Sequence, residues 1–302
     1  MKLATTTGDF GNYCKTHKDT LRCVYEAGFR YADLSLYDLD IKNGNPFMED
    51  GWKEYTCDLA EYAKELGITF VQAHSPGMRG NVLDHNEHYD YFLDATIRSI
   101  EICSLLGIKN TVFHTGFMEG VSKKDYFKEN ADFIRKLIPT MEKSGETLCI
   151  ENSTKVNMGT KYFFLEGYEM NEFIDYVGHP LLKACWDVGH ANLEGHNYKD
   201  IVDMKNNLVA LHIHDNFNFD SHQMPFTGNI NMDEVMQALV EIDYKGYFTM
   251  EASWTFTPGR VRKNPRDNER LRDIPLELML EAEKLLFKVG KWILQSYDCY
   301  EE

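Results

Sequence analysis

Carboxylates and imidazoles recur at the ends of apolar runs that have the composition of β-strands. Carboxylates end three of these runs, at Glu151, Asp187 and Glu251, and imidazoles lie at the ends of two others, at His114 and His212. A polar side chain that ends a buried strand costs free energy unless something binds it. The five recur at intervals of one strand plus one helix. They therefore predict a metal site at the mouth of a (β/α)8 barrel, where that fold places its active site.

The ligand types also indicate which metal would bind. Carboxylate oxygens and imidazole nitrogens suit a divalent, moderately hard ion such as Mn²⁺, Mg²⁺, Co²⁺ or Zn²⁺. Consecutive barrel strands place their end residues around one rim, so four adjacent strands can supply one ion. The sequence predicts that a single ion is ligated by Glu151, Asp187, His212 and Glu251.

Eight strand-like runs must position these residues. They begin near Leu3, Tyr31, Thr69, Asn110, Thr147, Lys183, Leu208 and Tyr247. Successive starts are roughly 25 to 41 residues apart, the length of one βα unit with its loops. Four helical stretches, over residues 19–27, 54–66, 91–106 and 125–144, each end directly before a glycine. A glycine just past a periodic segment is the expected carboxyl-terminal cap of a helix.

This alternation predicts the α/β class and a single (β/α)8 TIM barrel, with residues 1–302 as one domain. An open doubly wound sheet is the second choice. No Gly-x-Gly-x-x-Gly motif follows the first strand, so the main argument for a dinucleotide-binding sheet is missing. No low-complexity linker suggests a domain boundary.

Composition narrows the class of protein. Apolar residues make up 43% of the chain and the mean hydropathy is -0.44. No apolar run approaches the roughly 20 residues that span a bilayer, and the first residues lack the apolar stretch of a signal peptide. Seven cysteines without a Cys-x-x-Cys pair are typical of buried thiols in a reducing compartment. We therefore expect a cytoplasmic protein with no membrane partner.

The formal charge of -16 argues against a nucleic-acid partner, which needs a basic footprint. One basic stretch contains Arg260, Arg262, Lys263, Arg266, Arg270 and Arg272. Acidic residues are mixed with it, so a solvated loop or a subunit contact is favoured over a phosphate-binding role. Homo-oligomerisation stays open at this stage.

Three runs, at residues 149–152, 185–192 and 212–216, resemble the xylose isomerase-like TIM-barrel superfamily. The resemblance extends from the first strand to Ser253, and its most specific part is the D-x-x-H-x-N element that begins at Asp187. The superfamily includes hydroxypyruvate isomerases, ketose 3-epimerases, inosose dehydratases and the endonuclease IV family. In its isomerase branch the pattern assigns one metal to the four predicted ligands. It favours His212 over His214, since the family's ligand stands three residues before the position of Asp215.

The resemblance implies a metal-dependent sugar or polyol isomerase or epimerase that transfers a proton through an enediolate. Glu151 and Glu251 would remove and return the proton, and His190 would bind a substrate oxygen or orient Asp187. His74, His114 and His214 are the other expected substrate-binding residues, in a pocket for a small-molecule sugar or polyol. The remaining histidines are expected to be solvated: His17, His85, His88, His179 and His196.

The chain also resembles endonuclease IV, which implies a second interpretation of the metal site and of the function. That family's longer ligand list adds the positions of His74, His114 and His190 and makes Asp220 and His222 candidate ligands for additional metal, up to three zinc ions in all. Four carboxylates against three Zn²⁺ leave about +2, which suits a phosphodiester, whereas one ion leaves about -2, which suits a neutral polyol. The residues after His212 and the lack of a basic groove favour the sugar branch. A lyase or dehydratase of the same superfamily and an apurinic-site phosphodiesterase are the alternatives.

Overall fold

The computed structural model describes residues 1–39, 44–77, 83, 85, 88–116, 120–158, 162–194, 197–256, 271 and 274–302. His196 and the six basic residues between Arg260 and Arg272 lie outside the described residues. The eight strands are β1 (Lys2–Thr6), β2 (Tyr31–Ser35), β3 (Thr69–His74), β4 (Asn110–Phe113), β5 (Thr147–Glu151), β6 (Leu182–Asp187), β7 (Leu208–His212) and β8 (Tyr247–Met250). Each starts within one residue of its predicted position.

The strands form one parallel sheet in the order β7-β6-β5-β4-β3-β2-β1-β8. A parallel bridge between Ile213 and Met250 joins its two ends. The amide of Ile213 donates to the Thr249 carbonyl at 2.8 Å, and the amide of Glu251 donates to the Ile213 carbonyl at 2.9 Å. These bonds close the sheet into a barrel, which confirms the predicted architecture and excludes the open doubly wound sheet.

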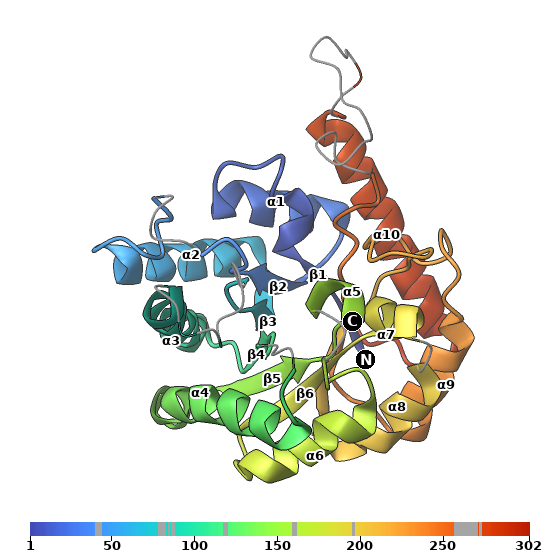
Figure 1. Ribbon diagram of the computed structural model, residues 1–302. Helices are drawn as coiled ribbons and strands as arrows, with labels where there is room; N and C mark the ends of the chain where they lie inside the picture. The colour runs from blue at the N-terminus through green and yellow to red at the C-terminus, as the bar shows by residue number, and fades with distance from the viewer. Residues whose placement is uncertain are drawn as a thin grey trace.

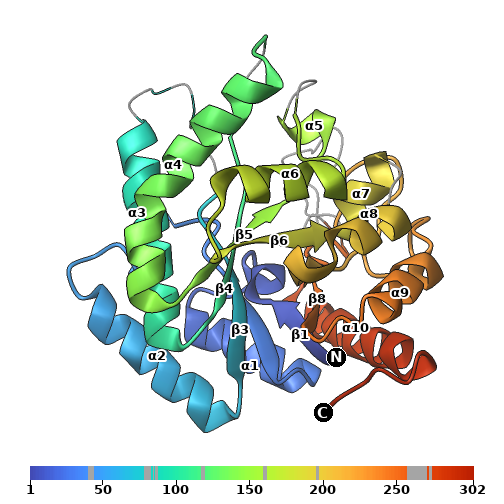
Figure 2. The ribbon, with the colours of Figure 1, turned by 90° about the horizontal axis from the view of Figure 1, so that it is seen from below.

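Helices surround the barrel in chain order, as the two views in Figures 1 and 2 show. They are α1 (His17–Ala27), α2 (Trp52–Leu66), α3 (His88–Leu106), α4 (Lys123–Ser144), α5 (Lys155–Met158), α6 (Gly167–Val177), α7 (Val188–Glu194), α8 (Asn197–Met204), α9 (Met232–Glu241) and α10 (Leu276–Ser296), with 3-10 turns η1 (Thr7–Phe10) and η4 (Lys205–Asn207). Among the described helices, none is long and apolar enough to cross a membrane.

The helix ends follow the capping signals in the sequence. α1 begins after Thr16, whose side chain accepts from the Asp19 amide, and α4 begins after Ser122, which accepts from the Asp125 amide. At the other ends, Gly28 and Gly145 adopt left-handed backbone conformations with φ of 114° and 65°. An L side chain is strained in that region, so glycine is the residue that ends these helices at low cost.

Two layers of apolar side chains hold the barrel. Large residues fill the space between strands and helices, for example Leu148 and Ile150 of β5. A separate small cluster joins β4 to β7 and consists of Val112, Cys149, Cys185 and Ala210. Because side chains alternate along a strand, the residue two positions after each of these four points the same way. Those next positions are His114, Glu151, Asp187 and His212, so the cluster forms the floor under the candidate site.

Candidate active site

The predicted site residues come from the carboxyl ends of six consecutive strands. They are His74 at the end of β3, His114 just after β4, Glu151 at the end of β5, Asp187 at the end of β6, His212 at the end of β7 and Glu251 just after β8. Three further residues, His214, Asp220 and His222, follow β7. His190 lies in α7, directly after β6. The structure brings all ten to one mouth of the barrel.

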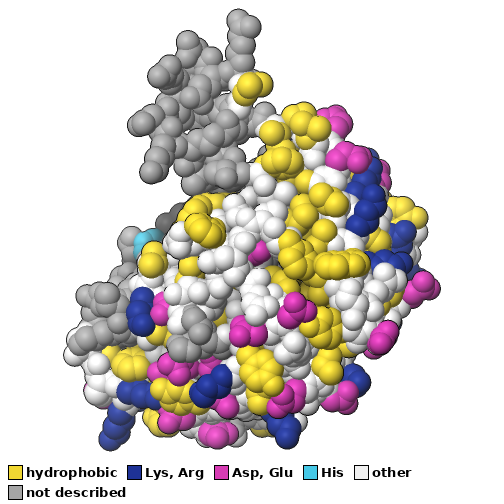
Figure 3. All heavy atoms as spheres, turned by 90° about the vertical axis from the view of Figure 1, so that its right-hand side faces the viewer, with side chains coloured by type: hydrophobic (Ala, Val, Ile, Leu, Met, Phe, Trp, Pro, Cys, Tyr) yellow, Lys and Arg dark blue, Asp and Glu magenta, His cyan; other side chains and the backbone are white. Residues whose placement is uncertain are grey.

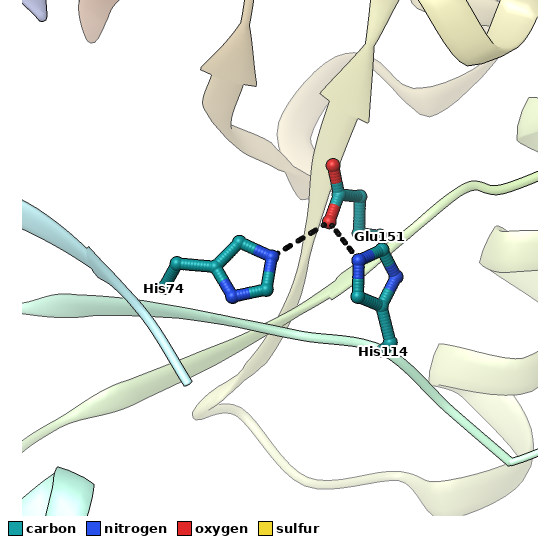
Figure 4. A group of neighbouring side chains, drawn as sticks. All are labelled: His74, His114 and Glu151. Atoms are coloured by element: carbon teal, nitrogen blue, oxygen red, sulfur yellow. Dashed lines mark ion pairs between the residues drawn. The ribbon is translucent and has the colours of Figure 1, made fainter. Parts of the chain in front are cut away.

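Glu151 lies at the centre of this group. Its Oε1 is 2.7 Å from His212 Nδ1. Its Oε2 is 3.2 Å from His114 Nε2 and 3.6 Å from His74 Nε2. Figure 4 shows the rings of His74 and His114 both directed at that one oxygen. One carboxylate therefore belongs to two neighbouring sets of nitrogen ligands.

The charges around Glu151 are strongly coupled. Burial by itself raises the pKa of Glu151, but the charges of His114 and His212 and hydrogen bonds from His212 and His74 outweigh burial and hold that pKa well below its ordinary value. Burial lowers the pKa of the His114 imidazole to about 4. Burial also lowers the pKa of His212, but the charges of Glu251 and Glu151 outweigh it and raise that pKa well above its usual range. The carboxylates thus favour the protonated form of His212, whereas burial favours the neutral form of His114.

A second part of the site is built around Asp187. Both of its oxygens lie 3.0 Å from His214 Nε2, and Oδ1 accepts from the His190 amide at 2.6 Å. Asn152 fixes this strand end, since its side chain accepts from the Asp187 amide at 2.7 Å and donates to the Asp187 carbonyl at 2.9 Å. His214 reaches Asp187 because residue 189 is glycine. A Cβ at Gly189 would lie 1.9 Å from the His214 ring.

The third part of the site lies in the segment after β7. Asp220 is 3.1 Å from His190 Nε2 through Oδ2 and 3.2 Å from His222 Nε2 through Oδ1. Burial lowers the pKa of His222, but the charges of Asp220 and Glu251 outweigh it and raise that pKa to about 9. Asp215 shapes the segment, because its carboxylate accepts from the amides of Asn216, Gly228 and Ile230.

The four predicted ligands of one ion satisfy the distance requirement of a metal site. Ligand atoms of Glu151, Asp187, His212 and Glu251 all lie within 4.8 Å of one another. His212 Nδ1 is 3.3 Å from Glu251 Oε2, so the two glutamates contact the same ring nitrogen. Four further groups meet the same criterion: His74 with His114 and Glu151, Glu151 with Cys185 and His212, His190 with Asp220 and His222, and His214 with His222 and Glu251.

Unsatisfied polar atoms support cation binding at this mouth. Among the described residues, buried Glu151 Oε2, His114 Nδ1 and Asp220 Oδ1 make no well-aligned hydrogen bond, although each of the two carboxylate oxygens has an imidazole nitrogen 3.2 Å away. Buried polar atoms are normally paired, so each such atom calls for an explanation. Two of the three are carboxylate oxygens, and divalent ions are bound by oxygen and imidazole nitrogen. The residues present therefore fit a divalent metal ion.

A cavity of about 910 Å³ opens over these groups. Its lining includes Glu151, Glu251, His74, His114, His190 and His222 at the barrel mouth, and it extends over the segments after β1 and β2 to Lys15 and His17. Small-molecule sites span roughly 300–1,000 Å³. His214 is fully buried against Asp187 and is not among the described residues that line the cavity.

The structure corrects one expectation and adds one residue. His17 is not simply solvated, because its Nδ1 lies 2.6 Å from the Tyr55 hydroxyl and its ring lies 4.6 Å from that of Phe47. Burial lowers the pKa of His17 to about 4. Sequence reasoning also missed Asp33 of β2, whose Oδ2 is 3.5 Å from His212 Nε2 and accepts from Gln72 at 2.6 Å. The sequence feature that could have indicated Asp33 is a carboxylate within a strand-like run.

The two ring nitrogens of His212 contact different carboxylates, Glu151 and Asp33. Nδ1 faces the carboxylates at the mouth, and Nε2 faces Asp33 on the inner side. Histidine ligands of metals usually donate their second ring N–H to a carboxylate or carbonyl, which fixes the tautomer and the ring orientation. Asp33 is placed to do this for His212, leaving Nδ1 directed at the ligand group.

Comparisons with known proteins agree with this architecture. The family model described as a xylose isomerase-like TIM barrel matches residues 21–272. A D-psicose 3-epimerase from Enterocloster bolteae is 24% identical over 206 residues, which cover 66% of this chain and 66% of that protein.

Solved structures show the same fold. A D-psicose 3-epimerase from Clostridium cellulolyticum H10, solved with D-tagatose, superposes with a TM-score of 0.73 at 18% identity and covers 97% of this chain and 99% of its own. The IOLI protein, solved with a bound zinc atom, superposes with a TM-score of 0.72 at 16% identity and covers 98% and 99%. Both likenesses concern the fold alone.

Proposed function

This chain belongs to the xylose isomerase-like TIM barrel family, and on that premise we propose that it is a divalent-metal-dependent sugar or polyol isomerase or epimerase. The observation that carries the proposal is the placement of Glu151 and Glu251. Both carboxylates contact Nδ1 of His212, at 2.7 and 3.3 Å, and both line the cavity. Two carboxylates that flank one point suit proton removal from a carbon and proton return to it.

Glu151, Asp187, His212 and Glu251 would hold the ion. When bound, a divalent metal supplies a Lewis acid that stabilises the negative charge developing on a substrate carbonyl oxygen. One glutamate carboxylate takes the proton from the carbon next to the carbonyl, and a carboxylate returns a proton to the same or the neighbouring carbon. Return at the same carbon from the opposite face is epimerisation. Return at the former carbonyl carbon, with the hydroxyl proton passing from one oxygen to the other, is isomerisation.

The histidines around the cavity are proposed to bind substrate oxygens. His74, His114 and His190 line the cavity together with the two glutamates. The carboxylate of Asp220 faces His190 Nε2 at 3.1 Å, which favours the N–H form of that nitrogen. His214 is buried behind Asp187, so we propose that it positions that carboxylate. Because D-psicose is a ketose, the similarity to D-psicose 3-epimerases makes ketoses the first substrate class to examine.

A second candidate function is metal-dependent phosphoester cleavage. The observation in its favour is that two more ligand groups, one at His74 and one at His222, satisfy the same distance criterion as the central group. Several divalent ions would neutralise the carboxylates and suit an anionic substrate. Under this alternative the cavity histidines would be ligands and would not contact substrate.

Solvent labelling and metal counting separate the two candidates. In D₂O with a divalent ion, a ketohexose substrate should gain deuterium at the carbon next to the carbonyl, measured by NMR. Glu151→Gln and Glu251→Gln should each abolish the exchange, while Glu172→Gln on the exposed side of α6 should not. One metal per chain is the expected count. Turnover without solvent label, or two or three ions per chain with chelator-sensitive cleavage of a phosphodiester, would contradict the proposal.

A further inference from the structure

The outer face of α10 carries large apolar side chains at a regular spacing. Leu278, Leu285 and Trp292 are 52%, 50% and 58% exposed and stand seven residues apart. A neighbouring face of the same helix, roughly 100° around its axis, is already packed, with Met279, Leu286 and Ile293 almost fully buried. Figure 3 shows hydrophobic side chains gathered along this side of the molecule. A helix that is apolar on two faces is typically covered on both.

The spacing is the one that helix pairs use. Seven residues are close to two turns of an α-helix, so positions seven apart drift by only about 20°. Leu278, Leu285 and Trp292 therefore form one nearly straight row along α10. Rows of this kind pack against a second helix at a small crossing angle. A ligand groove or a lipid surface would not require the seven-residue period.

A second aromatic side chain extends the apolar row beyond the helix. Phe226, in the segment after β7, is 56% exposed and contacts Trp292 with ring centroids 5.5 Å apart. Scattered single apolar residues on a surface need no explanation, but a contiguous set often marks an interaction site. Trp and other aromatic residues are enriched among those that contribute most to binding.

Charges beside the row identify the partner. The amino-terminal half of α10 carries Glu277 and Glu281 with one base, Lys284, which pairs with Glu281 at 2.7 Å, whereas the charges of the carboxyl-terminal half are Lys288 and Lys291. Next to the row, exposed Glu281 lies at the level between Leu278 and Leu285, and exposed Lys288 lies at the level between Leu285 and Trp292. A second α10 laid antiparallel, with Leu285 at the midpoint, brings each acidic half against the basic half of the other helix.

We propose that this face binds a second copy of the chain, with the two α10 helices antiparallel about a two-fold axis near Leu285. In this arrangement Leu285 meets its symmetry mate, Leu278 meets the partner's Trp292, and Glu281 faces the partner's Lys288. The pairing is isologous, because each contact occurs twice and closes a dimer. Complementary charge at the helices also explains how copies with a formal charge of -16 can approach one another.

Sedimentation equilibrium of the full chain tests the proposal. The wild type should have twice the 35.1 kDa mass of one chain at micromolar concentration. Leu285→Glu places two carboxylates at the axis and should give a monomer. The matched control is Leu105→Glu, which introduces the same charge at a 44% exposed leucine of α3 and should leave the dimer intact. Circular dichroism of each variant checks that the barrel is folded.

A charge exchange provides a second test that leaves the apolar row unchanged. Glu281→Lys sets lysine against the partner's Lys288 and should weaken the dimer at least tenfold at low salt. Adding Lys288→Glu restores opposite charges across the axis and should recover most of the affinity. A wild type that is monomeric at every concentration would overturn the proposal. So would a dimer that Leu285→Glu leaves intact, because its interface would then lie elsewhere.

Discussion

Strand β5 has a buried glutamate at each end, and the two behave in opposite ways. Glu151 ends the strand at the mouth of the barrel, and Glu146 precedes it at the other end. Both are almost fully buried, at 1% and 0% exposure. The pKa of Glu151 is held well below its ordinary value, whereas burial raises the pKa of Glu146 to about 7. The two glutamates thus share residue type, strand and burial, but their pKa values shift in opposite directions.

The neighbours of each carboxylate explain the difference. Glu151 has His74, His114 and His212 within 3.6 Å of its oxygens. Glu146 accepts one hydrogen bond, from the Thr111 hydroxyl at 2.7 Å, and its Oε2 has no hydrogen-bond partner among the described residues. A buried carboxylate stays ionised when positive groups surround it and takes up a proton when they are missing. The comparison shows that the mouth surrounds its buried carboxylate with imidazoles and the opposite end does not.

The largest expected effect is on metal binding at the mouth. Glu151→Ala should reduce bound metal to near zero and lower turnover about 10²–10⁴-fold, since it removes both a ligand and a proton-transfer group. Glu146→Ala changes the same residue type on the same strand and should keep full occupancy. Atomic emission analysis of the two purified variants measures the contrast. Equal metal loss in both would show that strand damage, not ligation, is responsible.

The next effect is on stability, at the opposite end of β5. The folded-state pKa of Glu146, about 7, lies above the ordinary value of 4.5, so the folded state prefers the protonated form. The resulting stability is fully present below about pH 4.5 and is lost as pH rises through 7. Glu146→Gln imitates the protonated form at every pH. Its stability relative to wild type should therefore rise by about 3 kcal/mol between pH 4.5 and 8.

Urea denaturation at several pH values measures this difference between the free energies of unfolding. Glu129→Gln on α4 is a suitable control, because that side chain is only partly buried and its pKa is lowered, chiefly by a hydrogen bond from Lys128. The stability of Glu129→Gln relative to wild type should not rise with pH. A Glu146→Gln variant with a pH-independent difference from wild type would contradict the raised pKa.

The smallest effect concerns the orientation of one ligand. Asp33→Ala should lower metal affinity roughly 10–100-fold, because His212 loses the carboxylate that faces its Nε2. Asp33→Asn keeps an oxygen at that position and should lose less. Chelator-competition titration measures the affinity without reference to turnover. If Asp33→Ala folded normally and bound metal as tightly as wild type, the role assigned to Asp33 would be wrong.

Local patterns in the sequence were enough to predict the barrel. All eight strands begin within one residue of the predicted positions, and the glycines after four helices cap them as expected. Strands and helix caps depend on neighbours within a few residues, so they can be predicted directly from the amino-acid sequence. The set of ligand types followed from the same regularity, since each stands at a strand end.

Pairings across the barrel could not be obtained from the sequence in this way. His212 and His214 point to the same side of one segment, yet the fold places His212 against Glu151 and His214 against Asp187. The contact of Asp33 with His212 joins residues far apart in the chain. The sequence by itself determined which strands and ligand types exist. Tertiary structure decided which charges meet, because barrel closure sets those distances and because burial and neighbouring charges fix each ionisation state.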